Sequence, residues 1–371
     1  MEILIVTQDF PPERGGIQTY ALELARNFMA LGARVRVICP GRASDANPLP
    51  SLADLKRLPV HSSLLFLPLL WYLPRYLRRH PSVDRVVFAQ WQPALVETLP
   101  YPGRRRHKSY CLVHGRELYA SVFGPAAPFM RRRVFAALDA AFPNSAEVLR
   151  LTRERAAPAR PLHLVHPGVD PGAFRRADAG FLRARYGLGD APVIVSLTRM
   201  VARKNLRGLI EALPLVRARV PGTKLLLGGT GPEREALMRL AVSSGLGETV
   251  LFPGRIADGE MNAHYSLADV FALPSLSERG DIEGFGIVFL EAGACETPVV
   301  GTLSGGIPDA IADGETGLLV PAGNRESLAE ALVRLLKNKA MARDMGRRAR
   351  ERIENGFTWR AAAERMLGFM A

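Results

Sequence analysis

Short apolar runs, each followed by a glycine-bearing loop and a helical pattern, recur along this sequence and limit the folds open to it. The first such unit has the run Glu2–Thr7, a loop with Gly15 and Gly16, apolar residues at helical spacing over Ile17–Leu31, and a second run, Arg34–Cys39. Runs of this kind suit buried parallel strands, which helices cover on both faces. Their order predicts an α/β fold with Rossmann-like, doubly wound sheets.

The same pattern returns in the second half of the chain. A polar passage rich in Gly and Ala, Asp170–Pro192, separates the two halves. The strand-like runs after it begin at Val193, Lys224, Thr249, Asp269 and Pro298. A chain of 371 residues is also long for a single core. We therefore expect a first domain over residues 1–170, a second over 171–356, and a terminal helix, 357–371, that packs back on the first.

The cysteines and the first residues bear on the compartment. Cys39, Cys111 and Cys295 have neither C-x-x-C nor metal-ligand spacing. This predicts reduced, buried thiols in a cytoplasmic protein. Met1 leads directly into a strand-like run, so we expect no signal peptide.

Positive charge is concentrated in the first half. Residues 1–170 hold 23 Lys and Arg against 13 Asp and Glu, whereas residues 171–371 hold 26 against 23. A basic half suggests an anionic partner, such as a membrane surface, a nucleic acid or a phosphorylated ligand. The sequence has no zinc-finger spacing, no aromatic RNA-binding strand motif and no recognisable helix-turn-helix, so we expect no nucleic acid.

Two segments of the basic half have the composition of a membrane-contacting surface. The apolar part of the segment 59–81 is too short to span a bilayer, and we expect Pro68 and Pro74 to interrupt it. Its aromatic and basic residues are Trp71, Tyr72, Arg75, Tyr76, Arg78 and Arg79. The second segment is an amphipathic helix with Arg131, Arg132 and Arg133 on or near one face. The alternative is a buried strand and surface helices with solvated arginines.

The stretch Glu278–Val300 is the main candidate for a ligand site. Glu283 lies in a loop with two glycines, and Glu291 lies eight positions later, in the early turns of a helix that begins near Phe285–Ile287. A helix N-terminus offers unpaired N–H groups to an anion, and glycines let a ligand approach the backbone. Two carboxylates can accept hydrogen bonds from the hydroxyls of a sugar and a ribose. The alternative is a capped helix start with two surface glutamates.

Basic and titratable residues stand at other predicted strand ends. Arg199 ends the run that starts at Val193, and Lys204 follows five residues later. Such a pair can clamp a diphosphate, because Arg forks to two oxygens and Lys acts as a point charge. His114 follows the strand Tyr110–Val113, at the sheet edge where ligands bind in Rossmann-like folds. The alternatives are surface cations and a structural histidine.

A metal site is a further possibility in the same stretch. Glu278, Asp281 and Glu283 carry ligand types that suit Mg²⁺. Arg199 and Lys204 already supply the positive charge that such a metal would bring. We therefore expect no metal and no other cofactor.

Together these motifs resemble those of glycosyltransferase family 4. The resemblance covers nearly the whole chain and implies the GT-B fold, in which two Rossmann-like domains face a central cleft, and retaining transfer from a nucleotide-sugar. The motifs that carry it are Gly15-Gly16-Ile17, His114-Gly115-Arg116-Glu117, Arg199 with Arg203-Lys204, Gly229-Thr230-Gly231-Pro232, and Glu283-Gly284-Phe285-Gly286 with Glu291. Within the family, the motifs resemble those of GDP-mannose-dependent mannosyltransferases that act on phosphatidylinositol mannosides. Glu296 departs from the pattern, which usually has glycine there.

The resemblance implies a role for each matched residue of the second half. Arg199 and Lys204 would hold the donor diphosphate and stabilise the leaving phosphate. Glu283 would bind the transferred sugar, and Glu291 would bind the ribose. The remaining donor contacts would come from Gly231, from Arg255 and Ile256 at the base, and from the backbone of Phe285, Gly286 and Ile287 at the sugar.

In the first half, the resemblance implies contacts with the sugar and the acceptor. His114 would contact the sugar near its anomeric carbon, and Gly16 would approach the donor phosphate or the acceptor. Asp9 and Gly15 would contact the acceptor.

The implied reaction moves mannose from GDP-mannose to a hydroxyl of a lipid-linked or glycan acceptor. Departure and attack would share one face, the leaving phosphate would take the acceptor proton, and no protein nucleophile would be needed. The protein would then be cytoplasmic, with reversible binding to the anionic inner face of the cell membrane.

Three alternatives remain. A UDP-sugar-dependent transferase of polysaccharide or glycolipid synthesis would use the same motifs. A retaining glycoside hydrolase would use two carboxylates close to one bond, but not the Arg199 and Lys204 cations. A non-enzymatic protein that binds anionic surfaces would explain the basic half, but not the glycine loops at strand ends.

Overall fold

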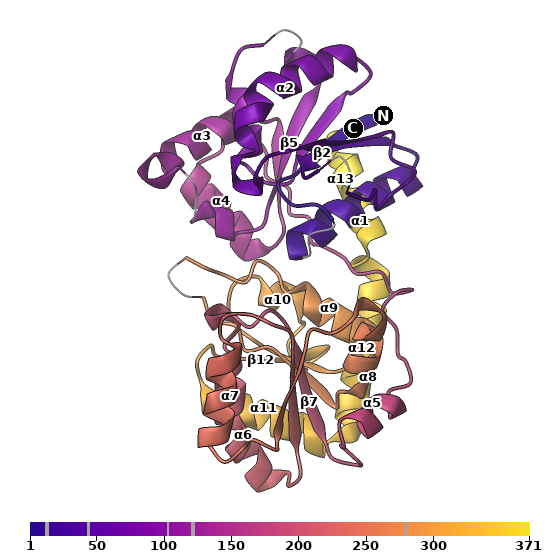
Figure 1. Cartoon of the computed structure of the whole chain (residues 1–371), viewed down its shortest axis with the longest axis vertical. Coiled ribbons are helices and arrows are strands. Elements are labelled where there is room, and N and C mark those ends of the chain that lie inside the picture. The colour runs from indigo at the N-terminus through magenta and orange to yellow at the C-terminus, as the bar shows by residue number, and fades with distance from the viewer. Residues whose placement is uncertain (12–14, 43–44, 102–103, 120–122, 278–279) are drawn as a thin grey trace. The chain divides into compact units, whose positions relative to one another are not determined.

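The chain folds into two compact units. The computed structural model describes residues 1–11, 15–42, 45–101, 104–119, 123–277 and 280–371, without the side chain of Arg105. One unit comprises Met1–Pro167 and Trp359–Ala371, and the other comprises Gly168–Thr358. Each unit is built on one parallel sheet with helices on its faces (Figure 1).

The first unit has a six-stranded sheet in the order β3-β2-β1-β4-β5-β6. Its strands are β1 (Glu2–Val6), β2 (Arg34–Pro40), β3 (Asp54–Leu58), β4 (Arg85–Phe88), β5 (Lys108–Val113) and β6 (Ala140–Pro143). Its helices are α1 (Gly16–Ala30), α2 (Phe66–Arg79), α3 (Ala127–Ala137), α4 (Ala146–Ala156) and α13 (Trp359–Met370). The central strand β1 is buried along its whole length, as expected for a parallel strand covered on both faces.

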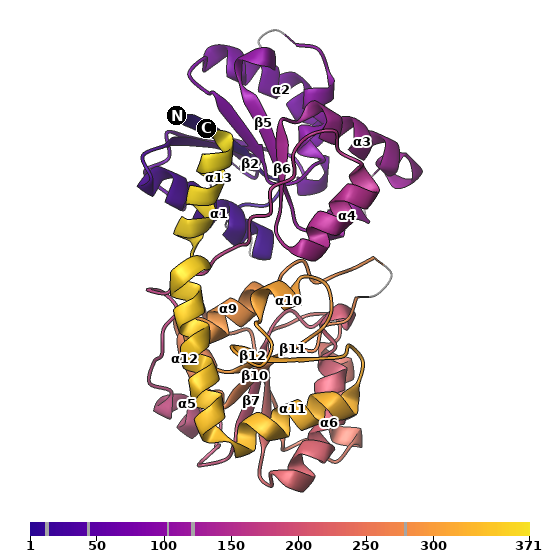
Figure 2. The same cartoon turned by 180° about the vertical axis from the view of Figure 1, so that it is seen from behind.

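Helix α13, at the end of the chain, belongs to this first unit. It lies beside α1 in both views (Figure 2). The rings of Trp359 and Tyr20 meet edge to face, with their centroids 5.1 Å apart. The two buried aromatic rings therefore join the last helix to the first.

The second unit has a six-stranded sheet in the order β12-β11-β10-β7-β8-β9. Its strands are β7 (Val193–Leu197), β8 (Lys224–Gly228), β9 (Val250–Gly254), β10 (Val270–Ala272), β11 (Val299–Thr302) and β12 (Gly317–Val320). Its helices are α5 (Gly180–Arg185), α6 (Leu206–Arg219), α7 (Arg234–Ser243), α8 (Met261–Leu267), α9 (Ile287–Ala294), α10 (Ile307–Ala310), α11 (Arg325–Lys337) and α12 (Lys339–Gly356).

Both sheets have the same topology, and each has one point where the strand order reverses. In the first unit this point lies between β1 and β4, and in the second between β7 and β10. The loops that leave two such strands turn in opposite directions, so they leave a crevice at the carboxyl ends where ligands of open α/β sheets bind. The topology thus predicts one candidate site in each unit.

Helix α2 differs from the sequence prediction. Pro68 and Pro74 do not interrupt it, since the helix runs continuously from Phe66 to Arg79. A proline in the first turn costs no hydrogen bond, and the one at Pro74 removes a single donor from a helix whose inner face is packed.

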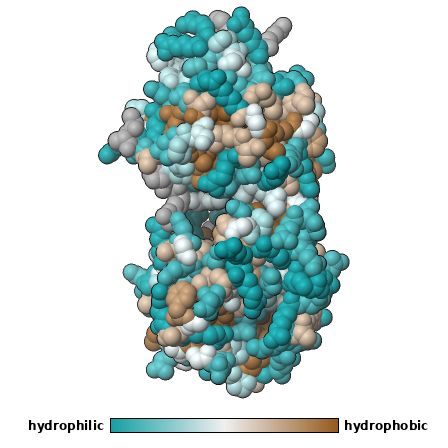
Figure 3. Space-filling view, turned by 90° about the vertical axis from the view of Figure 1, so that its right-hand side faces the viewer, coloured by the Kyte–Doolittle hydropathy of each residue, from teal (hydrophilic) through white to brown (hydrophobic). Residues whose placement is uncertain are grey.

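No helix in the described part of the chain is long and apolar enough to cross a membrane. On the face shown in Figure 3, hydrophilic residues predominate.

The departure at Glu296 has a conformational consequence. Glu296 follows α9 with a φ of 58°, in the left-handed region that favours glycine. Its carbonyl oxygen points at α12, where a Cβ atom added to Gly346 would lie only 2.0 Å away. The glycine in α12 therefore makes room for the turn that ends α9.

We predict that Gly346→Ala destabilises the second unit by about 1–3 kcal/mol, because overpacking at a fixed backbone contact costs that much. The matched control is Gly368→Ala in α13, where a Cβ atom would meet nothing within 4 Å. An exposed helical Gly→Ala change should stabilise by up to about 1 kcal/mol. Thermal unfolding of the two variants checks this, and equal melting temperatures would contradict the packing argument.

Candidate functional site

In the first unit, Asp9 lies at the point where the strand order reverses. Gln90, just after β4, donates through Nε2 to Asp9 Oδ2 at 2.7 Å. Gln18 of α1 donates through Nε2 to Asp9 Oδ1 at 3.2 Å. Gln90 is itself held by the backbone N–H of Gln8, at 3.1 Å. Two amides therefore fix the carboxylate of Asp9 at the carboxyl edge of the sheet.

His114 lies at the same edge, directly after β5. Its Nε2 is 3.0 Å from the carbonyl oxygen of Ala89, so this nitrogen carries the proton and donates. The ring of Tyr20 packs edge-on against the imidazole, with centroids 5.1 Å apart. In the neutral ring, Nδ1 is then the acceptor. The contacts fix both the tautomer and the orientation of His114.

Gly15 and Gly16 stand at the start of α1. Both are exposed, and a Cβ atom on Gly16 would meet nothing within 4 Å. The protein itself therefore leaves open space at the N-terminus of this helix, whose first N–H groups have no intrahelical partner.

In the second unit, a buried cluster of charges surrounds Glu283. Three donors converge on its Oε2: Nζ of Lys204, Nη1 of Arg203 at 2.6 Å, and Oγ of Ser275 at 3.5 Å. Lys204 and Glu283 have side chains that are only 10% and 12% exposed. Arg203 also pairs with Asp281, with Nε 3.2 Å from Oδ1. The loops after β7 and β10 are joined by these ion pairs at the second reversal point.

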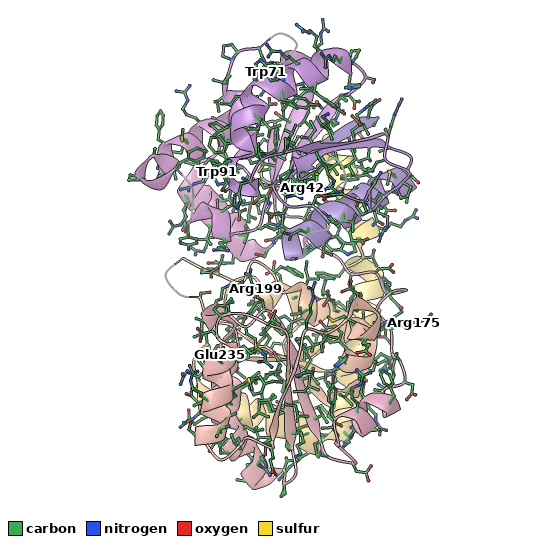
Figure 4. The ribbon with its side chains drawn as sticks, in the orientation of Figure 1. Arg42, Trp71, Trp91, Arg175, Arg199 and Glu235 are labelled. Carbon is green, nitrogen blue, oxygen red and sulfur yellow. The ribbon has the colours of Figure 1, made fainter. Side chains whose placement is uncertain are left out.

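The electrostatics of the cluster favour an additional anion. Burial raises the pKa of Glu283, but Lys204 and Arg203 outweigh burial and hold the pKa below its usual value. Burial, Arg203 and Arg199 lower the pKa of Lys204, although Glu283 opposes this. Arg199, exposed and labelled in Figure 4, is thus close enough to act on Lys204. Three cations face two carboxylates, and the surplus positive charge suits a phosphate.

The backbone around Glu283 is held by the loop after β11. Gly306 donates its N–H to the carbonyl oxygen of Glu283 at 2.8 Å. Gly305 has a φ of 58°, and a Cβ atom there would lie 2.3 Å from the same oxygen. The close approach requires glycine at 305. Gly286 then begins α9, and Ile287 is the first helical residue.

Phe285 has a structural side chain. It is 2% exposed, and its ring stacks on that of Phe357 with centroids 6.3 Å apart. Its side chain therefore serves the packing of the second unit and is not available to a ligand.

The glycine loops after β8 and β9 lie at the same sheet edge as the cluster, and the first of them contacts the loop that carries Arg199. Met200, after β7, donates its N–H to Thr230 at 2.8 Å, which places Gly231 beside the loop that carries Arg199. Gly229 donates to the carbonyl of Gly254 at 2.7 Å. Next along the chain, Arg255 is exposed and Ile256 is half-buried. The predicted donor-binding loops thus share the carboxyl edge of one sheet.

Glu291 lies on α9, about one turn after Ile287. Tyr265 of α8 donates its hydroxyl to Glu291 Oε2 at 2.5 Å. Burial raises the pKa of Glu291, and the hydrogen bond from Tyr265 partly opposes this rise. The carboxylate is therefore anchored through one of its two oxygens.

The structure brings the sequence-predicted residues together within each unit. Those at the edge of the first sheet are Asp9, Gly15, Gly16 and His114, and those at the edge of the second are Arg199, Lys204, Gly231, Arg255, Ile256, Phe285, Gly286, Ile287, Glu283 and Glu291. Sequence reasoning missed the partners Gln18, Gln90 and Tyr265, and it gave Arg203 no separate role. The position of Gln90 just after an apolar, strand-like run could have identified it as a site residue. No comparable sequence pattern marks Gln18 or Tyr265.

The hypothetical magnesium ligands do not form a cluster in the described part of the chain. Glu278 lies outside the described residues, while Asp281 and Glu283 are paired with Arg203. Nor does any group of three His, Cys, Asp or Glu suited to a metal occur among residues that the structure describes.

Comparison with known protein families accounts for both halves of the chain. The family model "Glycosyltransferase Family 4" matches residues 14–173, and the model "Glycosyl transferases group 1" matches residues 179–352. A GDP-mannose-dependent alpha-(1-6)-phosphatidylinositol monomannoside mannosyltransferase of Mycobacterium tuberculosis is 34% identical, over 99% of this chain and 97% of that protein. The same-named protein of Mycolicibacterium smegmatis is 35% identical, over 98% and 97%.

Solved structures agree on the fold. Sucrose-phosphate synthase from Thermosynechococcus elongatus superposes with a TM-score of 0.83 at 25% identity, over 99% of this chain and 98% of that one. Anabaena HepE in complex with UDP and glucose superposes with a TM-score of 0.80 at 19% identity, over 100% and 99%. The second likeness supports the fold alone.

We predict that Glu283→Gln lowers the melting temperature at pH 7 by about 4 °C or more, because it leaves two buried cations without their shared partner. The pKa of Glu283 is depressed in the folded state, so its contribution is present above the unfolded pKa of about 4.3 and is lost as the pH falls through the folded value. The difference from the unmodified protein should shrink between pH 5 and pH 3.

The matched control is Glu330→Gln, which removes a surface pair with Arg219. Its carboxylate is 63% exposed, and such pairs contribute little. A pH-independent effect of Glu283→Gln, or an equal effect of both variants, would contradict the electrostatic account of the cluster.

Proposed function

The chain belongs to glycosyltransferase family 4 and has the GT-B fold, and we propose that it transfers mannose from GDP-mannose to a hydroxyl of a lipid-linked acceptor, with retention of configuration. One observation carries the proposal: Lys204 and Arg203 pair with the buried Glu283 beside the start of α9, at the reversal point of the second sheet, and Arg199 next to them leaves one positive charge in excess. The site offers cations to a diphosphate and a carboxylate to sugar hydroxyls. The names of the mycobacterial relatives support mannose, GDP and a phosphatidylinositol mannoside acceptor.

Each group at the second sheet edge then has a chemical task. Arg199 and Lys204 hold the diphosphate and stabilise the negative charge that develops on it as the sugar leaves. Glu283 accepts hydrogen bonds from hydroxyls of the mannose. Glu291 accepts them from the ribose, and the backbone at Gly254–Ile256 faces the guanine.

The first sheet edge supplies the groups that meet the acceptor and the sugar. Asp9, already oriented by two amides, accepts a hydrogen bond from an acceptor hydroxyl. His114 meets the mannose near its anomeric carbon. Gly16, where a Cβ atom would meet nothing within 4 Å, leaves the N-terminus of α1 open to the acceptor or to the donor phosphate, and Gly15 contacts the acceptor.

The transfer needs no protein nucleophile. The bond between the anomeric carbon and the β-phosphate oxygen breaks, and the acceptor oxygen bonds to the same face of that carbon. The acceptor proton passes to the departing phosphate oxygen. Because Lys204, Arg203 and Arg199 supply positive charge, we propose that no metal is required, and activity should persist in a chelator.

A donor panel tests the proposal against a UDP-sugar-dependent transferase and against a hydrolase. A ligand that binds only the native state stabilises it by RT ln(1 + L/Kd), where L is the free ligand concentration, so the melting temperature rises with the ligand's concentration and affinity. GDP and GDP-mannose should raise it, whereas UDP, ADP and their sugars should not. If only UDP and UDP-glucose raise the melting temperature, the donor is a UDP-sugar and the proposed GDP-mannose is wrong. Release of sugar without any nucleotide would favour a glycoside hydrolase.

We predict that Lys204→Ala and Arg199→Ala each lower kcat by about a hundredfold or more, because two charge-assisted hydrogen bonds that strengthen as the phosphate leaves contribute about 1.5–3 kcal/mol each. The matched control is Arg207→Ala, an exposed arginine on α6 that pairs with Glu211 at 3.4 Å. Initial rates with the donor at saturation check the prediction. Near-normal kcat in either cluster variant would remove that residue from the mechanism.

The first unit also has a surface that suits a membrane carrying the acceptor. Trp71 on α2 is 60% exposed and lies on the outer face of that helix (Figure 4). Leu67 on α2 and Phe129 on α3 are 51% and 65% exposed. Arg75 lies over the Trp71 ring, 4.0 Å from its centroid. The rings of Phe66 and Phe123 meet where α2 begins and the chain leads into α3, at a centroid distance of 4.9 Å.

Two residues expected on this surface are buried instead. Tyr76 is 5% exposed, and its hydroxyl donates to Asp54 at 2.5 Å. Arg131 is 4% exposed and donates to the carbonyl oxygen of Arg155, through Nη2 at 3.1 Å. The inner face of each helix packs against the rest of the first unit, so the side chains on that face are not available to a bilayer. Arg132 and Arg133 remain exposed.

We predict that the exposed residues of α2 and α3 bind an anionic bilayer. Replacing Arg78, Arg79, Arg132 and Arg133 with serine should weaken sedimentation with phosphatidylinositol-containing liposomes by tenfold or more, because each cation near such a surface contributes about 1 kcal/mol. The matched control replaces four exposed arginines of the second unit: Arg207, Arg239, Arg325 and Arg343. Binding should also fall as salt rises. Equal binding to neutral and anionic liposomes would contradict the prediction and favour a soluble acceptor.

A further inference from the structure

Tyr265 is a buried tyrosine whose hydroxyl meets one carboxylate. It lies on α8 and has no exposed surface. Its hydroxyl donates to Oε2 of Glu291 at 2.5 Å. A phenol in an apolar core needs a hydrogen-bond partner, and here the partner is a residue of the candidate donor site.

The ring of Tyr265 is fixed from several sides. Phe174 and Phe271 pack edge-on against it, with centroid distances of 6.1 and 5.5 Å. Thr297 donates its hydroxyl to the Tyr265 carbonyl oxygen at 2.7 Å. A ring held in this way keeps its hydroxyl at one place. The contact with Glu291 is therefore a rigid anchor for a side chain that has three rotatable bonds.

The protonation states suit an anchor. Burial raises the pKa of Tyr265 well above its usual range, so the hydroxyl remains a donor. Burial also raises the pKa of Glu291, and the hydrogen bond from Tyr265 lowers it. Cys295, which caps the C-terminus of α9, has a pKa raised to about 12 by burial and by Glu291, so it brings no charge. The hydrogen bond thus helps to keep Glu291 ionised and able to accept.

We propose that Tyr265 is a positioning residue for nucleotide recognition: it binds one oxygen of Glu291 and so orients the carboxylate toward the ribose hydroxyls of the nucleoside diphosphate. The inference rests on the proposed function, in which Glu291 binds the ribose. Tyr265 itself, having no exposed surface, does not touch the nucleotide. Its effect passes through Glu291 alone.

The test compares GDP with 2′,3′-dideoxy-GDP, which lacks both ribose hydroxyls, by titration calorimetry. Both ligands have the same base and phosphates, so the ratio of their two Kd values reports only the contribution of the ribose hydroxyls to binding. UDP and 2′,3′-dideoxy-UDP are run in parallel, so that an error in the proposed base does not affect the outcome. The unmodified protein should bind the ribonucleotide about tenfold or more tightly than its dideoxy form.

Tyr265→Phe should lower this ratio threefold or more, while binding of the dideoxy form stays unchanged. The double variant Tyr265→Phe with Glu291→Gln should have the same ratio as Glu291→Gln alone. The matched control is Tyr186→Phe, which removes a hydroxyl that is 2.9 Å from Nε2 of His264, on the same helix. A merely structural effect of losing a buried hydroxyl would weaken both nucleotides equally, and the control should keep the original ratio.

The failures of the two claims are distinct. If Glu291→Gln keeps the original ratio, the ribose role of Glu291 is wrong, and the inference is overturned with it. If Glu291→Gln lowers the ratio but Tyr265→Phe keeps it, the proposed function stands and the positioning role is overturned. Equal weakening of ribo- and dideoxy-nucleotide by Tyr265→Phe would also overturn it, because the hydroxyl would then be structural.

Discussion

The pairing of Lys204 and Arg203 with Glu283 is the interaction on which the candidate site depends. Taking charges out of water costs several kcal/mol per ion, and a buried pair often contributes no net stability. Such a cluster is therefore weak support for the fold and a strong indication of function. It joins the loop after β7 to the loop after β10, and the N–H of Gly306 fixes the backbone of Glu283. A ligand meets charges already in place, so little reorganisation accompanies binding.

The shared topology of the two sheets explains why both candidate sites lie where they do. Each sheet reverses its strand order once, and loops with polar groups leave the carboxyl ends of the strands at that point. The first unit presents a neutral amide pair and an oriented carboxylate, Asp9, together with His114 in a fixed tautomer. The second presents surplus positive charge around Glu283. Each unit therefore carries one candidate site at the carboxyl edge of its sheet, and the two sites differ in charge.

The central strands and the site loops could be predicted from the sequence, because buried parallel strands are continuously apolar and each ends in a glycine loop. The edge strands β3 and β12 could not. β3 has three charged residues among five, and β12 is a four-residue run in a turn-rich segment. The apparent basic face of α3 was also misleading, since Arg131 turns inward to the carbonyl of Arg155. Spacing places Glu291 on a helix, but only the packing of α8 reveals Tyr265, because that contact joins residues from separate elements.

The most direct test of the central claim is the anomeric configuration of the product. The protein is incubated with GDP-α-D-mannose and a phosphatidylinositol monomannoside in anionic liposomes, and the mannosylated lipid is analysed by NMR and by α-mannosidase digestion. A single added mannose in α linkage is expected, formed without added metal and about a hundredfold or more slowly with Lys204→Ala. A β-linked product, or transfer only from a UDP-sugar, would contradict the claim.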